Sequence, residues 1–152
     1  MIVYRKASIS EAPQIAEFQL QMAQESEGLA LNPEEVERGV LKVFEDSRWG
    51  QYFVCEVGGQ IAGSTLIQYE WSDWRDAVVW WIHSVYVVPQ YRRKGVFTSM
   101  FQLIRQEAIN TGNVKGLRLY VEKSNQSAQQ CYESLGMTSD RYSLYELMLS
   151  GK

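Results

Sequence analysis

Residues 80–98 read WWIHSVYVVPQYRRKGVFT, and the rest of the chain is interpreted around this stretch. Its first half is rich in β-branched and aromatic residues, which predicts a strand over 77–88 that stops at Pro89. Downstream, apolar residues recur at helical spacing as far as Asn110, so a helix is expected there. A short basic loop with one glycine connects the two elements.

This loop places Arg92, Arg93, Lys94 and Gly95 directly before the helix, and none of these side chains can cap it. A helix start leaves backbone N–H groups without partners and carries partial positive charge. Gly95 lets a ligand approach the backbone closely. The loop therefore favours a phosphate or pyrophosphate site, with a solvated basic turn as the alternative.

The composition limits the classes of function. A chain of 152 residues predicts one domain over 1–152, and 45% hydrophobic content with 22% charge is typical of a globular protein. The net charge of −3 argues against nucleic-acid or membrane partners. Cys55 and Cys131 form no Cys-x-x-Cys pair and His83 is the only histidine, so no metal site is expected. Free cysteines and no leader or membrane span suggest a cytoplasmic protein.

The remaining segments predict an α/β (α+β) fold. The expected order is β-α-α-β-β-β-α-β-α-β, in a mixed, mostly antiparallel sheet of six to seven strands with helices on both faces. The strands are expected at 2–6, 51–57, 60–71, 77–88, 117–122 and 142–149, and three of the helices after caps at Ser10, Asn32 and Asn125. Ligands in such sheets bind near the carboxyl ends of parallel strands, where the basic loop follows residues 77–88.

Two motifs resemble those of the GNAT superfamily of N-acetyltransferases. The first pattern, Gln/Arg-x-x-Gly-x-Gly/Ala, corresponds to residues 92–97, with Phe97 at the small-residue position. The second, Asn-x-x-Ala-x-x-x-Tyr-x-x-x-Gly-Phe, corresponds to residues 125–137, with Met137 in place of phenylalanine. The order of elements also matches, so the resemblance covers nearly the whole chain.

The resemblance implies acetyl-CoA as cosubstrate and direct attack by an amine on its thioester. It assigns cofactor-binding roles to backbone groups of the central strand, to the loop and helix start, and to the second motif: Val85, Tyr86, Val87, Arg92, Arg93, Lys94, Gly95, Val96, Phe97, Thr98, Asn125 and Ala128. It also implies that the central strand separates from the next strand at a bulge. Tyr132 would reach the sulfur.

Two side chains are candidate catalytic groups. Departure of the thiolate needs a proton, and Tyr132 can donate one; the alternative is a packing role. The amine must be neutral to attack, and His83 can accept its proton near pH 7. Strand alternation predicts that His83 shares a face with Trp81, Val85 and Val87. Water or a carboxylate such as Glu70 stays open as the base.

The leading hypothesis is an acetyl-CoA-dependent N-acetyltransferase for a primary amine of a small molecule. Two alternatives stay open: a non-catalytic acyl-CoA-binding or sensing module on the same fold, and a protein N-acetyltransferase. Carboxylates and tryptophans near the central strand could line a pocket for a cationic acceptor: Trp71, Trp74, Trp80, Trp81, Glu70, Asp73 and Asp76. The aromatic content is also compatible with a homodimer.

Overall fold

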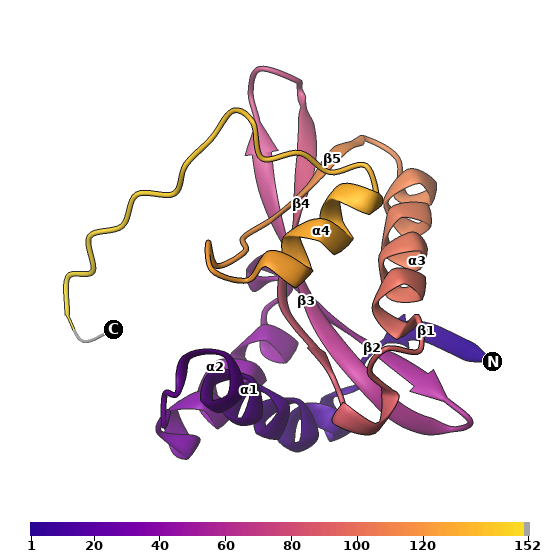
Figure 1. Ribbon diagram of the computed structural model, residues 1–152. Coiled ribbons are helices and arrows are strands. Elements are labelled where there is room, and N and C mark those ends of the chain that lie inside the picture. Colours follow the sequence, from indigo (N-terminus) through magenta and orange to yellow (C-terminus); the bar gives the residue numbers. More distant parts are fainter. Residues whose placement is uncertain (151–152) are drawn as a thin grey trace. The chain divides into compact units, whose positions relative to one another are not determined.

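A computed structural model describes residues 1–150 of the chain (Figure 1). The internal contacts divide the chain into two compact units, residues 1–120 and the part that begins at Val121.

The first unit is built on a five-stranded sheet in the order β1-β2-β3-β4-β5. The strands are β1 Ile2–Lys6, β2 Gln51–Val57, β3 Gln60–Ser72, β4 Ala77–Val87 and β5 Val114–Leu119. The pairs β1–β2, β2–β3 and β3–β4 are antiparallel, whereas β5 is parallel to β4. The prediction of a mixed, mostly antiparallel sheet is therefore confirmed, but the predicted number of six to seven strands is not.

Three α-helices belong to this unit: α1 Ala12–Glu27, α2 Pro33–Glu45 and α3 Val96–Thr111. Short 3-10 helices precede α1 (η1 Ile9–Glu11), follow α2 (η2 Ser47–Trp49) and follow β4 (η3 Pro89–Tyr91). Asn32 caps α2 as predicted, since its Oδ1 accepts a hydrogen bond from the Glu35 N–H at 3.1 Å. The predicted cap at Ser10 is wrong, because Ser10 lies inside η1 and α1 begins after Glu11.

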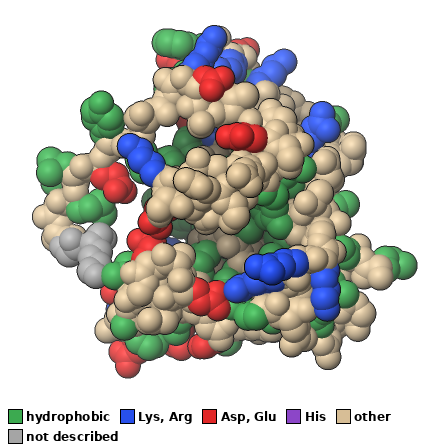
Figure 2. All heavy atoms as spheres, in the orientation of Figure 1, with side chains coloured by type: hydrophobic (Ala, Val, Ile, Leu, Met, Phe, Trp, Pro, Cys, Tyr) green, Lys and Arg blue, Asp and Glu red, His purple; other side chains and the backbone are tan. Residues whose placement is uncertain are grey.

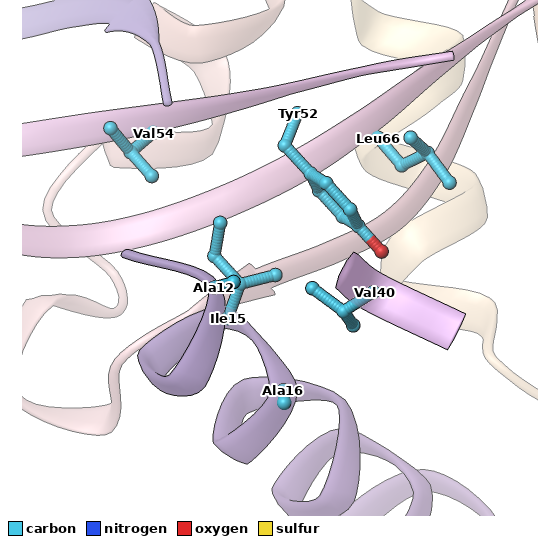
Figure 3. Packing of buried hydrophobic residues seen from close by; sticks show 7 residues of the cluster. All are labelled: Ala12, Ile15, Ala16, Val40, Tyr52, Val54 and Leu66. Atoms are coloured by element: carbon cyan, nitrogen blue, oxygen red, sulfur yellow. The ribbon is translucent and has the colours of Figure 1, made fainter. Parts of the chain in front are cut away.

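The core lies on both faces of the sheet because side chains alternate along β2. Tyr52 and Val54 point to one face, where they join Ile15 of α1 and Val40 of α2 (Figure 3). Cys55 points to the other face and packs against two side chains of α3. Burial of these apolar groups is the main favourable term in folding. Helices on both faces of the sheet are therefore confirmed for this unit.

The described part of the second unit, residues 121–150, contains one helix, α4 Gln126–Ser134. Asn125 caps it as predicted, with Oδ1 accepting from the Ala128 N–H at 3.1 Å. The predicted strand at 142–149 is wrong: the residues from Tyr142 to Met148 have no regular secondary structure. A β-strand needs the backbone groups of a neighbouring strand, and among the described residues no ladder includes a residue beyond Leu119.

Candidate active site

The central feature of the site is the point where β4 separates from β5. The two strands pair from Val78 to Ile82 on β4, and the pairing stops there. The next residues of β4 form a bulge, in which Leu66 opposes His83 but Ser64 opposes Tyr86, so β4 carries one extra residue. Ser84 takes a φ of 52° at this bulge. The bulge and the separation match the expectation drawn from the family resemblance.

Two buried residues of β3 support the bulge. The Thr65 hydroxyl donates a hydrogen bond to the His83 carbonyl at 3.0 Å. Gly63 lets the two backbones approach closely, since a Cβ at this position would lie 2.5 Å from the Tyr86 carbonyl oxygen. Because no strand follows on the β5 side in residues 1–120, the backbone edge of β4 from His83 to Val87 is left without a ladder partner there.

The bulge also changes which side chains share a face. His83 lies opposite Leu66, on the side that packs against α1 and α2. Tyr86 lies on the same side, with its ring stacked on Phe18 of α1 at 5.1 Å between centroids. Val87 instead packs against the cluster on the α3 side. The prediction that His83 shares a face with Val85 and Val87 is therefore wrong, because an extra residue reverses the alternation.

His83 lies among aromatic rings at the end of β5. Its imidazole stacks on Trp81 at 5.8 Å with an interplanar angle of 8°, and it lies 5.6 Å from the ring of Tyr120. Partial burial lowers the pKa of His83 from its ordinary value of 6.5. The imidazole is therefore mainly neutral at neutral pH, as a proton acceptor must be.

A charged network adjoins these rings. Glu70 accepts a hydrogen bond from Trp81 Nε1 at 2.7 Å and pairs with Arg118 at 3.1 Å. The carboxylate that the sequence offered as an alternative base therefore has two hydrogen-bond donors bound to it. The other tryptophans predicted to line the acceptor pocket have different surroundings. Trp80 is buried, while Trp71 and Trp74 are exposed near the β3–β4 turn.

The loop before α3 has the backbone form of an anion site. Arg93 and Gly95 both take left-handed conformations, with φ of 61° and 77°. Gly95 is the N-cap residue and no side chain caps the helix. A Cβ built on Gly95 would meet no atom within 4 Å, so the space in front of the loop is open. The predicted phosphate site lies at this uncapped helix start.

The three basic side chains of the loop have different surroundings. The Arg92 guanidinium donates to the Val87 carbonyl at 2.8 Å, pairs with Glu25 of α1 at 2.7 Å and lies over the Tyr86 ring. These contacts connect the loop to β4 and α1. Arg93 and Lys94 are exposed, with no ion pair to another described residue.

The first turn of α3 completes this part of the site. Val96 is buried against Cys55, so its side chain anchors the helix and only its backbone is available to a ligand. The Phe97 ring lies 6.4 Å from that of Phe101, one helical turn further along α3. Thr98 is exposed.

The second unit contains the remaining predicted residues. The Asn125 side chain accepts from the Ala128 N–H, so Oδ1 is used in the cap of α4. Tyr132 is half-buried, and desolvation followed by the charge of Cys131 raises its pKa above the ordinary value of 10.0. Gly136 ends the helix region with a φ of 92°, and the Met137 N–H donates to the Tyr132 carbonyl at 3.1 Å.

Sequence reasoning missed Tyr120, Thr65 and Gly63. Tyr120 follows the apolar alternation of β5 and looks like one more strand residue until the sheet places it beside His83. A glycine inside a strand pattern signals a bulge or a close backbone approach, and this signal could have identified Gly63.

Outside this site, three features bear on function: a groove, the arrangement of metal-binding side chains and the hydropathy of the helices. A groove of about 320 Å³ is lined by Phe53, Tyr69, Trp80 and the residues around Thr111, at the end of α3 remote from Gly95. Among residues 1–150, no group of three side chains is arranged to bind a metal ion. In the same range, no helix combines the length and the hydropathy needed to cross a membrane.

Comparisons with known proteins agree with this geometry. A crystal structure described as that of a possible acetyltransferase from Clostridium difficile 630 is 38% identical, covers 99% of both chains and superposes with a TM-score of 0.91. A predicted acetyltransferase with acetyl-CoA from Clostridium acetobutylicum is 19% identical over 96% of each chain, with a TM-score of 0.74, and so shows similarity of fold.

A curated relative matches a smaller part of the chain. The thialysine N-ε-acetyltransferase of Mus musculus is 32% identical over 79 residues, which are 52% of this chain and 45% of that protein. The chain thus matches less than half the length of this relative. The profile of the Acetyltransferase (GNAT) family matches residues 17–137, and this confirms the expectation of an acyltransferase enzyme. The chain belongs to the acetyltransferase (GNAT) family.

Proposed function

We propose that the protein is an N-acetyltransferase that transfers the acetyl group of acetyl-CoA to a primary amine of a small molecule. One observation carries this proposal. A strand with an unpaired backbone edge, His83 to Val87, leads directly into a helix start with two left-handed residues and no side-chain cap. The edge suits an extended chain of amides, and the helix start suits a diphosphate.

The loop residues fit the charged end of acetyl-CoA. The N–H groups from Arg93 to Thr98 would bind the pyrophosphate, because no side chain in the structure uses the first turn of α3 as a cap. Arg93 and Lys94 would add charge at the surface. Arg92 would act indirectly, by connecting the loop to Glu25 and Val87.

The unpaired edge of β4 fits the pantetheine and thioester end of acetyl-CoA. Backbone groups of Val85, Tyr86 and Val87 would hydrogen-bond the pantetheine amides and orient the thioester, which supplies the activated acetyl group. The Tyr86 ring takes no part, because it packs on Phe18 and its hydroxyl donates to Gln21 at 2.8 Å.

His83 and Tyr132 would move the protons. The neutral imidazole of His83 would accept a proton from the amine, directly or through water. Tyr132 would donate its hydroxyl proton to the departing thiolate, and its raised pKa keeps that proton in place until the thiolate forms. Asn125 would contact the pantetheine arm through its Nδ2, since its Oδ1 caps α4.

Two observations support a small amine as the acceptor. The mouse relative acts, by its name, on thialysine, which is a small amine. The rings of Trp81, His83 and Tyr120 beside Glu70 form a surface on which the alkyl part of such an acceptor could pack. We infer that the acceptor is of this class. A location in the cytoplasm remains our proposal as well.

The test uses two variants of one glycine. Asn and Asp have the same size, and both tolerate the left-handed conformation better than other side chains. Open space at Gly95 means that neither side chain clashes. Gly95→Asp places a negative charge at the proposed pyrophosphate site, whereas Gly95→Asn does not. Ligand at about 100 times its Kd stabilises a protein by about 2.7 kcal/mol.

We expect CoA to raise the Tm of the wild type and of Gly95→Asn, and to leave that of Gly95→Asp unchanged. Equal stabilisation of both variants would place the diphosphate elsewhere. A thiol-release assay with acetyl-CoA and a panel of small amines then tests transfer. Release with lysine-like amines supports the proposal, while CoA binding without release from any small amine or peptide would indicate a binding module.

A further inference from the structure

The groove beside the end of α3 is lined by one basic and one acidic side chain that the candidate active site does not use. It has a volume of about 320 Å³, and all its described lining residues belong to the first unit. The charged ones are Lys6 of β1 and Glu107 of α3. Within residues 1–150, neither forms an ion pair with another residue. A groove of this size with two charges is suited to a small polar ligand.

The floor of this groove is aromatic because strand pairing brings three rings to one face of the sheet. Phe53 lies opposite Lys6, and Tyr69 lies opposite Trp80, with 6.2 Å between the centroids of these two rings. Phe53 and Trp80 are only 4% and 7% exposed, and Phe53 is stacked on Tyr4 at 4.8 Å. The rings are therefore fixed in place, and the ligand meets a preformed apolar surface.

The two charges belong to the β1 side of the groove. Burial raises the pKa of Tyr4, and the charge of Glu107 adds to this effect, so the Glu107 carboxylate lies near β1. Lys6 follows Tyr4 by two residues and shares its face of the strand. The groove ends at Thr111 and Gly112, the C-terminus of α3, where partial negative charge disfavours an anion. A cationic group is thus favoured at Glu107 and an anionic group at Lys6.

Charge of both signs excludes several classes of ligand. On the face seen in Figure 2, basic and acidic side chains both appear, and neither sign covers that face alone. The net charge of the chain is only −3. A nucleotide or a basic peptide would bring several charges of one sign to a groove that offers one of each. A small zwitterion instead satisfies both charges at once.

We propose that this groove binds a free amino acid with an aromatic side chain. Its carboxylate pairs with Lys6, its ammonium group pairs with Glu107, and its ring packs over Phe53 and Trp80. Removal of the ring from water and its pairing with the aromatic floor favour binding. The groove lies at the end of α3 remote from Gly95, so this site is separate from the one proposed for acetyl-CoA and does not depend on it.

The first experiment measures binding to the wild-type chain by calorimetry. The probes are L-phenylalanine, 3-phenylpropanoate, which lacks the ammonium group, and 2-phenylethylamine, which lacks the carboxylate. We expect L-phenylalanine to bind with a Kd of about 1 mM, as suits a ligand of this size. Each analogue should bind at least about tenfold more weakly, because it loses one charge-assisted contact. Absence of saturation at about 10 mM L-phenylalanine, or equal binding of all three probes, would overturn the proposal.

The second experiment locates the site, and the wild-type comparison stands even if a variant fails to fold. Lys6→Gln and Glu107→Gln should each weaken L-phenylalanine binding by about tenfold. Lys42→Gln and Glu37→Gln are the matched controls, because both residues are exposed on α2, and they should keep the wild-type Kd. Gly95→Asp should also bind L-phenylalanine normally, so loss of CoA binding is scored separately. Wild-type affinity in both groove variants would refute this location.

Discussion

Gly63→Ala tests whether the bulge of β4 depends on the close approach of β3. The new Cβ would lie 2.5 Å from the Tyr86 carbonyl oxygen and 3.4 Å from the Val87 Cα. Since an ordinary carbon–oxygen contact needs about 3.2 Å, the two backbones must separate by about 0.7 Å, and neither contact atom belongs to a flexible side chain. Forcing one methyl group into a packed site typically costs about 1–3 kcal/mol.

Gly116→Ala is the control, because Gly116 lies in β5 and its Cβ would only touch Val79 at 4.0 Å. Urea unfolding of both variants measures the difference in the free energy of unfolding. In a chain of this size each kcal/mol also lowers the Tm by about 2–4 °C. Gly63→Ala should be the less stable by about 1–3 kcal/mol.

The same change displaces Tyr86 and Val87, whose backbone we propose for thioester binding. Acetyl transfer should therefore fall in Gly63→Ala even well below its Tm, while Gly116→Ala stays close to the wild type. Equal stability and equal turnover of the two variants would refute the account of the bulge.

Two further predictions concern the proposed proton transfers. Tyr132→Phe keeps the ring and should lower turnover by about 10²–10⁴-fold with little change in CoA binding, measured beside Tyr69→Phe as a control; unchanged turnover would leave Tyr132 a packing role. For His83→Gln we expect loss of the acidic limb of the pH–rate profile, which should lie below pH 6.5 because burial lowers this pKa. The lowered pKa of His83 also stabilises the fold above pH 6.5. This stabilisation is lost as the pH falls through the lowered pKa, since the unfolded chain then binds more protons. A limb that persists in the variant would point to another base.

The order of elements from β1 to α4 was predictable because its signals are local. The turn at Gly58 and Gly59, the cap at Asn32 and the apolar spacing of α3 each act over a few residues, and each element formed near its predicted place. The segment 142–149 shows the limit of this reasoning. Its pattern predicts a strand, but a strand exists only where another chain segment pairs with it.

The sequence by itself determined the approximate places of β1 to β5, the two helical layers and the uncapped basic start of α3, because alternation and spacing specify which faces are apolar. Only the tertiary structure decided the surroundings of the candidate site. The extra residue in β4 places Val85 and Val87 on the opposite face from His83. Arg92 forms an ion pair with Glu25, and the ring of Tyr120 lies next to that of His83. These outcomes depend on contacts between residues up to 67 positions apart, which no local pattern specifies.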